Sequence, residues 1–203
     1  MVWAIEQAKE AGVCGTIHVA TDSEVTARMA REAGAEVPFL RTDDVDDITS
    51  VGKAAANVVR RYSNELGRRF DLVCLLLATS PLRSPTDIVG CRDLLLENDS
   101  LDASGSVVQA EKHPAWAWRI IPDGRMVSMF PNLCHRDRHE LEPAYFYDGA
   151  VYWAWSDFFQ RVDGNQYLGD LGAYVMENER SVDVDTPLDW AFAEFLLQRQ
   201  LRS

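Results

Sequence analysis

The sequence predicts one α/β domain spanning residues 1–203, built on a mixed, mainly parallel sheet. Helical patterns alternate with short apolar runs along most of the chain, and this alternation is typical of βαβ units. The run Leu72–Leu77 is apolar throughout, as expected for a strand that a parallel sheet buries on both faces. Since 47% of the residues are hydrophobic, the chain can build a core of its own.

The first half of the chain contains the clearest helices and strands. Apolar residues recur at helical spacing in four segments, each bounded by a glycine or a capping residue. These expected helices are Met1–Ala11, a stretch closing at Gly34, Thr49–Leu66, and Ser84 to about Leu96. The expected strands are Thr16–Ala20, Glu36–Leu40 and Leu72–Leu77. The first two strands and the helix between them form a βαβ unit.

The second half is richer in aromatic residues and in β patterns. We expect a β-rich excursion at residues 103–155, with a hairpin turn at Pro122-Asp123-Gly124. The other expected elements are the hairpin strands Trp116–Ile121 and Arg125–Phe130, the strands Ala150–Trp153 and Ala173–Met176, and the helices Ser156–Val162 and Leu188–Leu201. The sheet should therefore be mixed.

Charge and cysteine usage exclude several classes of function. The net charge of −12 and the pI near 4.7 argue against binding to nucleic acid or to an anionic membrane. The four cysteines are widely separated and show no CxxC spacing, which indicates reduced thiols and a cytoplasmic location. No membrane-spanning stretch or signal peptide is recognisable. A phosphate-bearing ligand must therefore meet local basic residues or a metal ion.

Two aspartates one residue apart, Asp183 and Asp185, are the most informative local feature. In an extended segment alternate side chains share a face, so both carboxylates should point the same way. Hard oxygen ligands of this kind suit Mg²⁺ together with a phosphate. Thr186, Pro187 and Asp189 predict a helix N-terminus directly after them. An equally good interpretation makes the two aspartates solvated turn residues.

Two other stretches are candidates for ligand contacts. Ala78–Arg83 follows the most buried predicted strand, at the edge where open α/β sheets bind ligands, although a polar capping turn explains it as well. Arg136 and Arg138 belong to the densest basic cluster, which could clamp a phosphate or carboxylate or could simply be a solvated loop. No Ser/His/Asp triad, Walker A loop or GxGxxG turn is present.

Five stretches, in order along the chain, match motifs of one enzyme family. They are Val19–Glu24, Gly34–Arg41, Thr79–Arg83, Tyr145 with Asp148–Tyr152, and Asp183–Trp190. In these stretches the chain resembles the CMP-sugar synthetases, the cytidylyltransferases that activate nonulosonic acids such as sialic and pseudaminic acid. Each match is short, but five in register along nearly the whole chain are specific.

The resemblance implies a fold, a reaction and a set of site residues. The fold is a nucleotide-diphospho-sugar-transferase-like three-layer sandwich, in a homodimer whose β-rich excursion contacts the partner subunit. The reaction is attack of the anomeric hydroxyl of a 2-keto sugar acid on the α-phosphorus of CTP, with Mg²⁺ held by Asp183 and Asp185. The implied substrate-binding residues are Arg41, Thr79, Ser80, Arg138, Tyr145, Asp148 and Gly149.

Departures from the family pattern leave the sugar open. Leu77-Ala78 stands where the family has Gln-Pro, His139 replaces a glutamine, and Asp148 replaces an asparagine. The Ala-Thr form resembles pseudaminic-type enzymes more than sialic-type ones. Synthetases for the eight-carbon sugar Kdo carry an acidic pair at Thr79-Ser80, which disfavours that branch.

The family also implies a strand and a triphosphate-cradling loop, similar to Arg-Gly-Gly-Ser-Lys-Arg, before the first helix. If the chain truly begins at Met1, we expect weak CTP binding and little turnover. One alternative function is therefore a truncated, weakly active or inactive member that serves as a binding or assembly subunit. Another is a nucleotidyltransferase of the same fold that uses a different nucleotide or acceptor.

Overall fold

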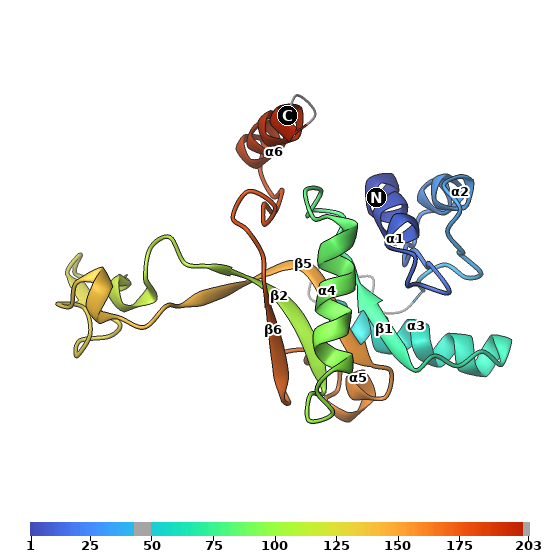
Figure 1. The fold of residues 1–203 in the computed structure, drawn as a ribbon, viewed down its shortest axis with the longest axis horizontal. Coiled ribbons are helices and arrows are strands. Elements are labelled where there is room, and N and C mark those ends of the chain that lie inside the picture. Colours follow the sequence, from blue (N-terminus) through green and yellow to red (C-terminus); the bar gives the residue numbers. More distant parts are fainter. Residues whose placement is uncertain (43–49, 201–203) are drawn as a thin grey trace.

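The computed structural model describes residues 1–42 and 50–200, and Figure 1 shows their arrangement. The helices of this part are α1 (Val2–Ala11), α2 (Glu24–Glu32), α3 (Val51–Leu66), α4 (Pro85–Leu96), α5 (Phe158–Arg161) and α6 (Pro187–Gln200), with 3-10 turns at Pro114–Trp116 and Arg138–Glu140. The strands are β1 (Leu72–Leu75), β2 (Ala103–Gln109), β3 (Trp118–Ile120), β4 (Met126–Ser128), β5 (Tyr145–Trp155) and β6 (Leu171–Val175). None of the described helices has the length and hydropathy needed to cross a membrane.

The main sheet has the order β1-β5-β2-β6 and is mixed. Strand β5 runs antiparallel to both β1 and β2, whereas β2 and β6 are parallel. Three of these four strands therefore point the same way, with β5 reversed between them. The α/β class and the mixed sheet are confirmed.

Helices cover both faces of this sheet, which produces three layers (Figure 1). On one face Val151 and Trp153 of β5 pack with Ile88 of α4. On the other face Tyr152 and Ala154 of β5 pack with α5 and with Ala55 of α3. The alternation of β5 side chains between the two clusters follows from the pleat of a strand. Burial on both faces makes this strand the centre of the core.

The predicted ends of α1, α3 and α4 agree with the structure because local capping chemistry determines them. Helix α5 (Phe158–Arg161) is shorter than the predicted Ser156–Val162, and no side chain caps its N-terminus. The predicted start of α3, Thr49, lies outside the described residues. Ser84 and Asp87 form a reciprocal capping box in front of α4, with Pro85 in the first turn. Gly12 and Gly67 end α1 and α3 at φ values of 68° and 64°, a left-handed conformation that glycine adopts without strain. The predicted end of the last helix, Leu201, lies outside the described residues.

The strands differ more from the prediction. Strand β2 was not anticipated, because its sequence ASGSVVQ has no apolar run and no alternation. The predicted pair Thr16–Ala20 and Glu36–Leu40 appears as a single parallel bridge between His18 and Glu36. Strand β5 extends well beyond the predicted Ala150–Trp153, since its N-terminal part pairs with β2.

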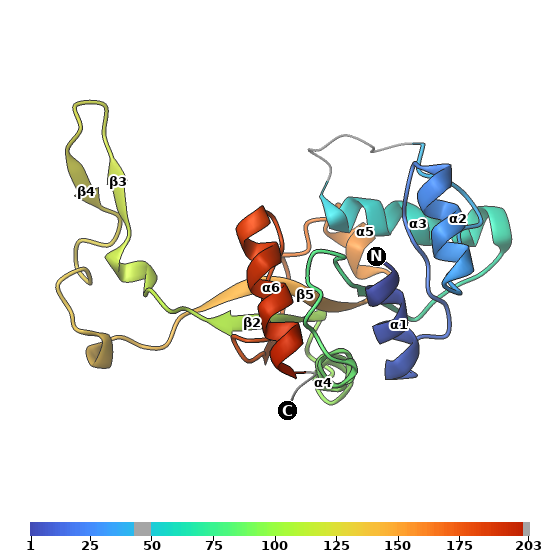
Figure 2. The same cartoon turned by 90° about the horizontal axis from the view of Figure 1, so that it is seen from above.

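Residues 110–144 project from the body as an arm that carries the β3–β4 hairpin (Figures 1 and 2). The hairpin turns at Asp123-Gly124 as predicted, with Ile120 opposite Met126. The predicted excursion, residues 103–155, therefore begins and ends in strands of the main sheet, and its middle forms the arm. Large apolar side chains are exposed along the arm: Trp118, Ile120, Met126, Met129 and Phe130.

Candidate functional site

Three loops meet beside the carboxyl end of β1. The first follows β1 at residues 77–84, the second is the turn 148–150 within β5, and the third is the segment 181–186 that leads into α6. The amide of Val184 donates a hydrogen bond to the carbonyl oxygen of Thr79 at 2.8 Å. The hydroxyl of Ser181 donates to the carboxylate of Asp148 at 2.9 Å. The fold thus brings three of the five family-like stretches together.

Asp183 and Asp185 are exposed, and both lie in the irregular segment before α6 rather than in a paired strand. Their neighbours Val182 and Val184 pack against a buried cluster that includes Leu82 and Leu196. The predicted alternation is therefore present: valines face inward and aspartates outward. Within the described chain neither carboxylate has a hydrogen-bonding or ion-pairing partner, so both are available to a ligand.

The chemistry of this pair fits Mg²⁺ only in part. Two carboxylates supply hard oxygen donors, but no group of three or more His, Cys, Asp or Glu side chains suited to a metal occurs in residues 1–42 and 50–200. Mg²⁺ commonly takes one or two protein carboxylates and completes its six ligands with phosphate oxygens and water. Asp183 and Asp185 would therefore hold the ion together with a phosphate-bearing substrate.

Asp189 has a different task. Its carboxylate accepts hydrogen bonds from the amide of Thr186 at 2.7 Å and from the hydroxyl of Thr186 at 2.8 Å. These bonds lower the pKa of Asp189 and confirm its predicted place in the helix cap. Of the three aspartates in this motif, only Asp183 and Asp185 remain uncommitted.

The first loop presents one exposed and one buried hydroxyl residue. Thr79 is exposed, whereas Ser80 is buried and its hydroxyl has no hydrogen-bonding partner in the described residues. Leu77 at the start of the loop touches the second loop, because a Cβ placed on Gly149 would lie 3.0 Å from Leu77 Cδ1. Gly149 has a φ of 72°, so both backbone and space favour glycine there.

Asp148 lies at the centre of a polar network. Only 8% of the residue is exposed, and its carboxylate accepts hydrogen bonds from the hydroxyls of Ser106 and Ser181 and from the amide of Ala150. Ser106 also accepts the amide of Val151 at 2.8 Å. Asp148 therefore joins β2, β5 and the segment before α6, and its predicted contact with substrate stays a prediction.

Two arginines of this region were not predicted as site residues. Arg83 is buried and donates to the carbonyl oxygens of Leu77 and Ala150 at 2.7 and 2.8 Å. Arg180 donates twice, at 3.1 Å, to the buried carboxylate of Asp87. Burial alone would raise the pKa of Asp87, but hydrogen bonds from Arg180 and Ser84 outweigh it and lower that pKa. Because Arg180 lies 93 residues from Asp87 in sequence, no local pattern could reveal the pair.

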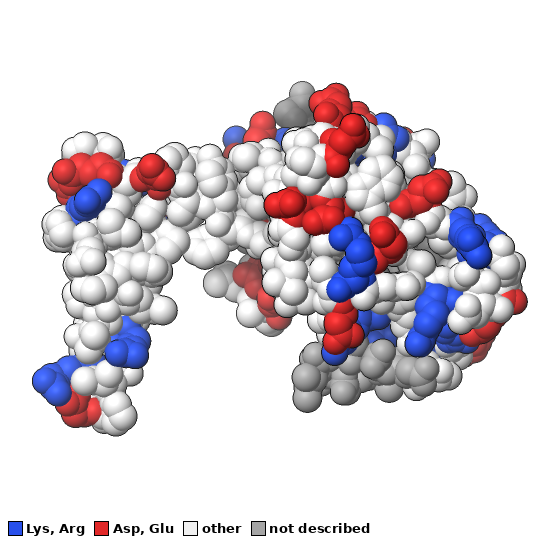
Figure 3. Space-filling view, turned by 90° about the horizontal axis from the view of Figure 1, so that it is seen from below, with Lys and Arg blue, Asp and Glu red and all other residues white. Residues whose placement is uncertain are grey.

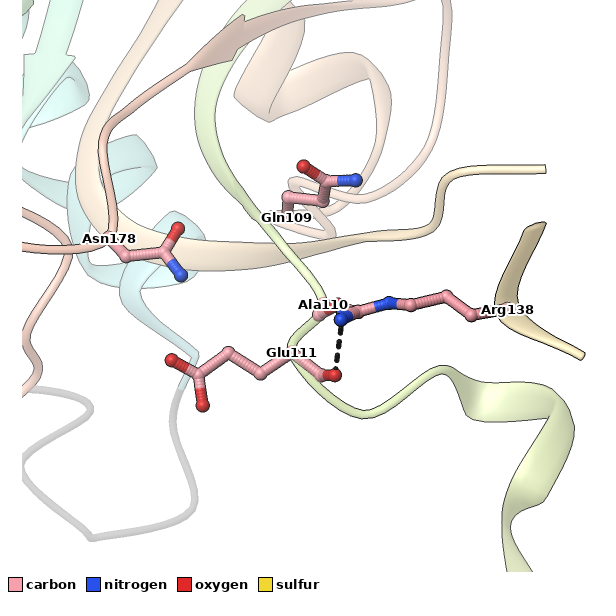
Figure 4. A pocket seen from close by; sticks show the side chains of 5 residues that line it. All are labelled: Gln109, Ala110, Glu111, Arg138 and Asn178. Carbon is pink, nitrogen blue, oxygen red and sulfur yellow. Dashed lines mark hydrogen bonds between the residues drawn. The ribbon is translucent and has the colours of Figure 1, made fainter. Parts of the chain in front are cut away.

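Arg138 and Tyr145 lie at the base of the arm. Figure 4 shows Arg138 pointing toward the backbone just after β2. Arg138, Gln109 and Asn178 are among the residues that line a pocket of about 590 Å³ there. Nη2 of Arg138 donates to the carbonyl oxygen of Glu111 at 2.7 Å and to that of Ala110 at 3.2 Å. Tyr145 is exposed and lies opposite Gln109 in the sheet. In the part of the chain that the structure describes, no hydrogen bond links the residues of this pocket to Asp183 or Asp185.

Arg41 lines a second, larger hollow on the other side of the first loop. The hollow has a volume of about 820 Å³ and lies between α1, α3, residues 13–20 and β1. Its walls are mostly apolar, and Leu77 and Ala78 belong to them. The hollow therefore extends from Arg41 to the residues just before Thr79. The backbone amide of Arg41 donates to the carbonyl oxygen of Thr21 at 2.8 Å, which fixes the chain at this point.

Comparison with known proteins identifies the family. The model of the family described as Cytidylyltransferase matches residues 1–201. The chain is 28% identical over 202 residues to the CMP-N,N'-diacetyllegionaminic acid synthase of Legionella pneumophila, covering 96% of this chain and 83% of the relative. It is 25% identical over 198 residues to the pseudaminic acid cytidylyltransferase of Campylobacter jejuni, covering 97% of this chain and 84% of that protein.

A solved structure shows the same fold. The structure of a CMP:2-keto-3-deoxy-manno-octonic acid synthetase complexed with CTP matches with a TM-score of 0.67 and 13% identity, covering 97% of this chain and 87% of that one. At this identity the likeness concerns the fold alone. The match of the family model over residues 1–201 shows that the chain belongs to the cytidylyltransferase family.

Proposed function

We propose that this protein transfers the cytidylyl group of CTP to a nonulosonic acid, releasing pyrophosphate. Its family and the activities that the names of its relatives state support this function. The observation that carries it is the hydrogen bond between Val184 and Thr79. That bond holds two uncommitted carboxylates, Asp183 and Asp185, beside the loop that the family resemblance assigns to cytidine and sugar.

The bonds exchanged are simple. The anomeric hydroxyl oxygen of the sugar acid forms a bond to the α-phosphorus of CTP, the bond from that phosphorus to the bridging oxygen breaks, and pyrophosphate leaves with that oxygen. The hydroxyl proton passes to solvent. Such phosphoryl-group chemistry depends chiefly on positioning and on compensation of negative charge. When bound by Asp183 and Asp185, Mg²⁺ would supply part of that compensation.

The other predicted residues have roles that fit their places. Thr79 offers an exposed hydroxyl at the mouth of the first loop, and Arg41 contributes to the hollow beside it. Arg138 and Tyr145 border the pocket at the base of the arm, where a guanidinium could meet a carboxylate. We assign the nucleotide to the side of Arg41 and the sugar acid to the side of Arg138, with the two aspartates between.

A sugar of the legionaminic or pseudaminic type is our preferred acceptor. Both of the compared relatives carry such sugars in their names, and Leu77-Ala78 supplies no side-chain amide at the position where sialic-type enzymes have one. The comparisons lend no support to the alternative of an inactive binding or assembly subunit.

We also propose that the protein works as a homodimer in the cytoplasm. The arm exposes large apolar side chains that the body of the same chain does not cover, and Figure 3 shows the stretch between its two charged ends as uncharged. Such surfaces mark protein interfaces, and a second copy is the simplest partner. The cysteines of the described residues are all free, which supports a reducing compartment.

The test is pyrophosphate release from CTP in the presence of Mg²⁺ and a panel of legionaminic, pseudaminic, sialic and Kdo acids. We expect release with the first two and little with Kdo. A thermal-shift panel with CTP, UTP, ATP and GTP distinguishes the alternative nucleotides, because a ligand that binds only the folded state raises the melting temperature. No release with any sugar acid, together with stabilisation by a nucleotide other than CTP, would overturn the proposal.

A further inference from the structure

Arg83 is the largest fully buried side chain of the described residues, with 1% of its surface exposed. It closes the first loop, four residues after Thr79 and directly before the cap of α4. Burial lowers its pKa to about 10, against the opposing effects of Cys74 and Asp148. It remains a cation at neutral pH, and no carboxylate forms an ion pair with it in the described part of the chain.

The guanidinium joins two of the three loops through a single nitrogen. Nη1 donates to the carbonyl oxygen of Leu77 at 2.7 Å and to that of Ala150 at 2.8 Å. Leu77 begins the loop that carries Thr79 and Ser80, and Ala150 follows Gly149 in the turn within β5. The carboxyl end of β1 is thus tied to the turn that contains Asp148.

The same loop is held from two further directions. The side-chain amide of Gln7, on α1, donates to the carbonyl oxygens of Pro81 and Arg83. The carbonyl oxygen of Thr79 accepts the amide of Val184 from the segment of the two aspartates. Displacement of this loop would therefore shift Thr79, Asp148 and Asp183 relative to one another.

Stability alone gives a poor account of an arginine at this place. Its Nε and Nη2 atoms are buried without a hydrogen-bonding partner in the described residues. A buried cation with unused donors costs folding free energy, and well-packed apolar residues often replace such groups without loss. The two carbonyl contacts, by contrast, set the distance between the loops. A feature that costs stability and fixes site geometry is expected at functional sites.

We propose that Arg83 is a positioning residue for the transfer reaction: by bridging the carbonyl groups of Leu77 and Ala150, it holds the Thr79–Ser80 loop and the Asp148–Gly149 turn at the separation that the substrates require. This inference rests on the proposed function. Because Arg83 is almost completely buried, we assign it no direct contact with substrate or metal, and it acts through the backbone of the two loops.

The test compares Arg83→Met, which keeps the length of the side chain but removes its donors, with Arg83→Lys, whose ammonium group can still donate to both carbonyls. With CTP and sugar acid saturating, and with folding verified by circular dichroism, we expect kcat to fall at least tenfold in R83M and to stay within threefold of wild type in R83K. Ile88→Val, a buried change in the adjacent α4, is the control that lowers stability without altering kcat. Wild-type kcat in folded R83M, or a tenfold loss in folded R83K, overturns the proposal.

Hydrogen exchange gives a readout that does not depend on activity. In R83K the amides of residues 77–84 and 149–151 should keep wild-type protection, whereas in R83M both segments should exchange faster while α3 does not. Unchanged protection in folded R83M, or faster exchange spread over the whole chain, overturns the proposal. A wild-type protein that releases no pyrophosphate contradicts the proposed function, and the exchange result then still decides whether Arg83 holds the two loops.

Discussion

The three-loop site and the arm differ in which side chains they bury and which they expose. In the site, polar groups such as Asp148, Ser106 and Arg83 are buried and bonded to main chain or to one another. In the arm, apolar groups such as Ile120 and Met126 are exposed, and the only sheet is the β3–β4 pair. The site holds its loops together with hydrogen bonds inside the chain, whereas the arm leaves apolar surface that a second molecule can bury.

The largest expected effect concerns the chemistry of the site. Changing Asp183→Asn or Asp185→Asn removes a carboxylate that we propose as a ligand of Mg²⁺, so we expect kcat/KM for pyrophosphate release to fall by about a hundredfold or more. The free energy of unfolding should change by less than about 0.5 kcal/mol, because both side chains are exposed and have no partner in the described chain.

Asp189→Asn is the matched control, since this carboxylate caps α6. It should lower stability only slightly, because an asparagine can still cap the helix, and leave kcat/KM within threefold of wild type. Equal loss of activity in all three variants would show that the aspartates act by shaping the segment rather than by binding metal.

The second effect concerns the buried pair beside the site. Arg180→Met leaves the carboxylate of Asp87 buried without its cation, so we expect the free energy of unfolding to fall by about 3 kcal/mol in urea denaturation. Arg199→Met breaks an exposed pair with Glu179 and should cost less than about 1 kcal/mol. Similar losses of unfolding free energy in the two variants would mean that the buried pair beside the site contributes no more to stability than the exposed pair.

Changes in the arm should alter assembly rather than the stability of the single chain. Ile120, 76% exposed, and Met126, 61% exposed, face each other in the hairpin. The double change to lysine should convert a dimer to a monomer in sedimentation velocity, with the unfolding midpoint of the monomer unchanged. Val25→Lys, at an exposed apolar position on α2, is the control that leaves assembly intact. If the double variant still dimerises, the arm does not form the dimer interface.

The smallest effect is a pH dependence centred on His18. Burial lowers the pKa of His18 to about 4, a shift that Glu36 opposes and Arg61 assists. Below pH 6.5 the unfolded chain binds a proton that the folded protein does not, so stability is lost as pH falls from about 6.5 to about 4. We expect a loss on the order of 1 kcal/mol, reduced by solvent screening because the ring is only partly buried.

Urea denaturation of wild type and His18→Gln at pH 7 and pH 5 measures this effect. The difference in unfolding free energy between the two proteins should shrink or change sign at the lower pH. A difference that is independent of pH would show that His18 does not contribute.

Helix boundaries and the candidate loops were predictable, because their signals are local. Ser84 with Asp87, Gly12 and Gly67 act on neighbouring amides and carbonyls, and the family-like stretches could be read in order along the chain. Strand β2 was not predictable, because Ser104 and Ser106 are buried and find their partners only after folding. Ser104 donates to the carbonyl oxygen of Cys91 on α4, 13 residues away, and Ser106 donates to the carboxylate of Asp148, 42 residues away. When those partners are unknown, the sequence predicts that a serine in a strand faces solvent.

By itself the sequence determined the α/β class, the caps, and the opposite directions of Val184 and Asp185, because spacing and short-range hydrogen bonds are properties of contiguous residues. Only the tertiary structure decided that Thr79 meets Val184, that Arg83 bridges Leu77 and Ala150, and that the arm stands away from the body. Those features depend on which surfaces face each other after folding. A buried hydrogen bond has no sequence signature when its donor and acceptor come from distant parts of the chain.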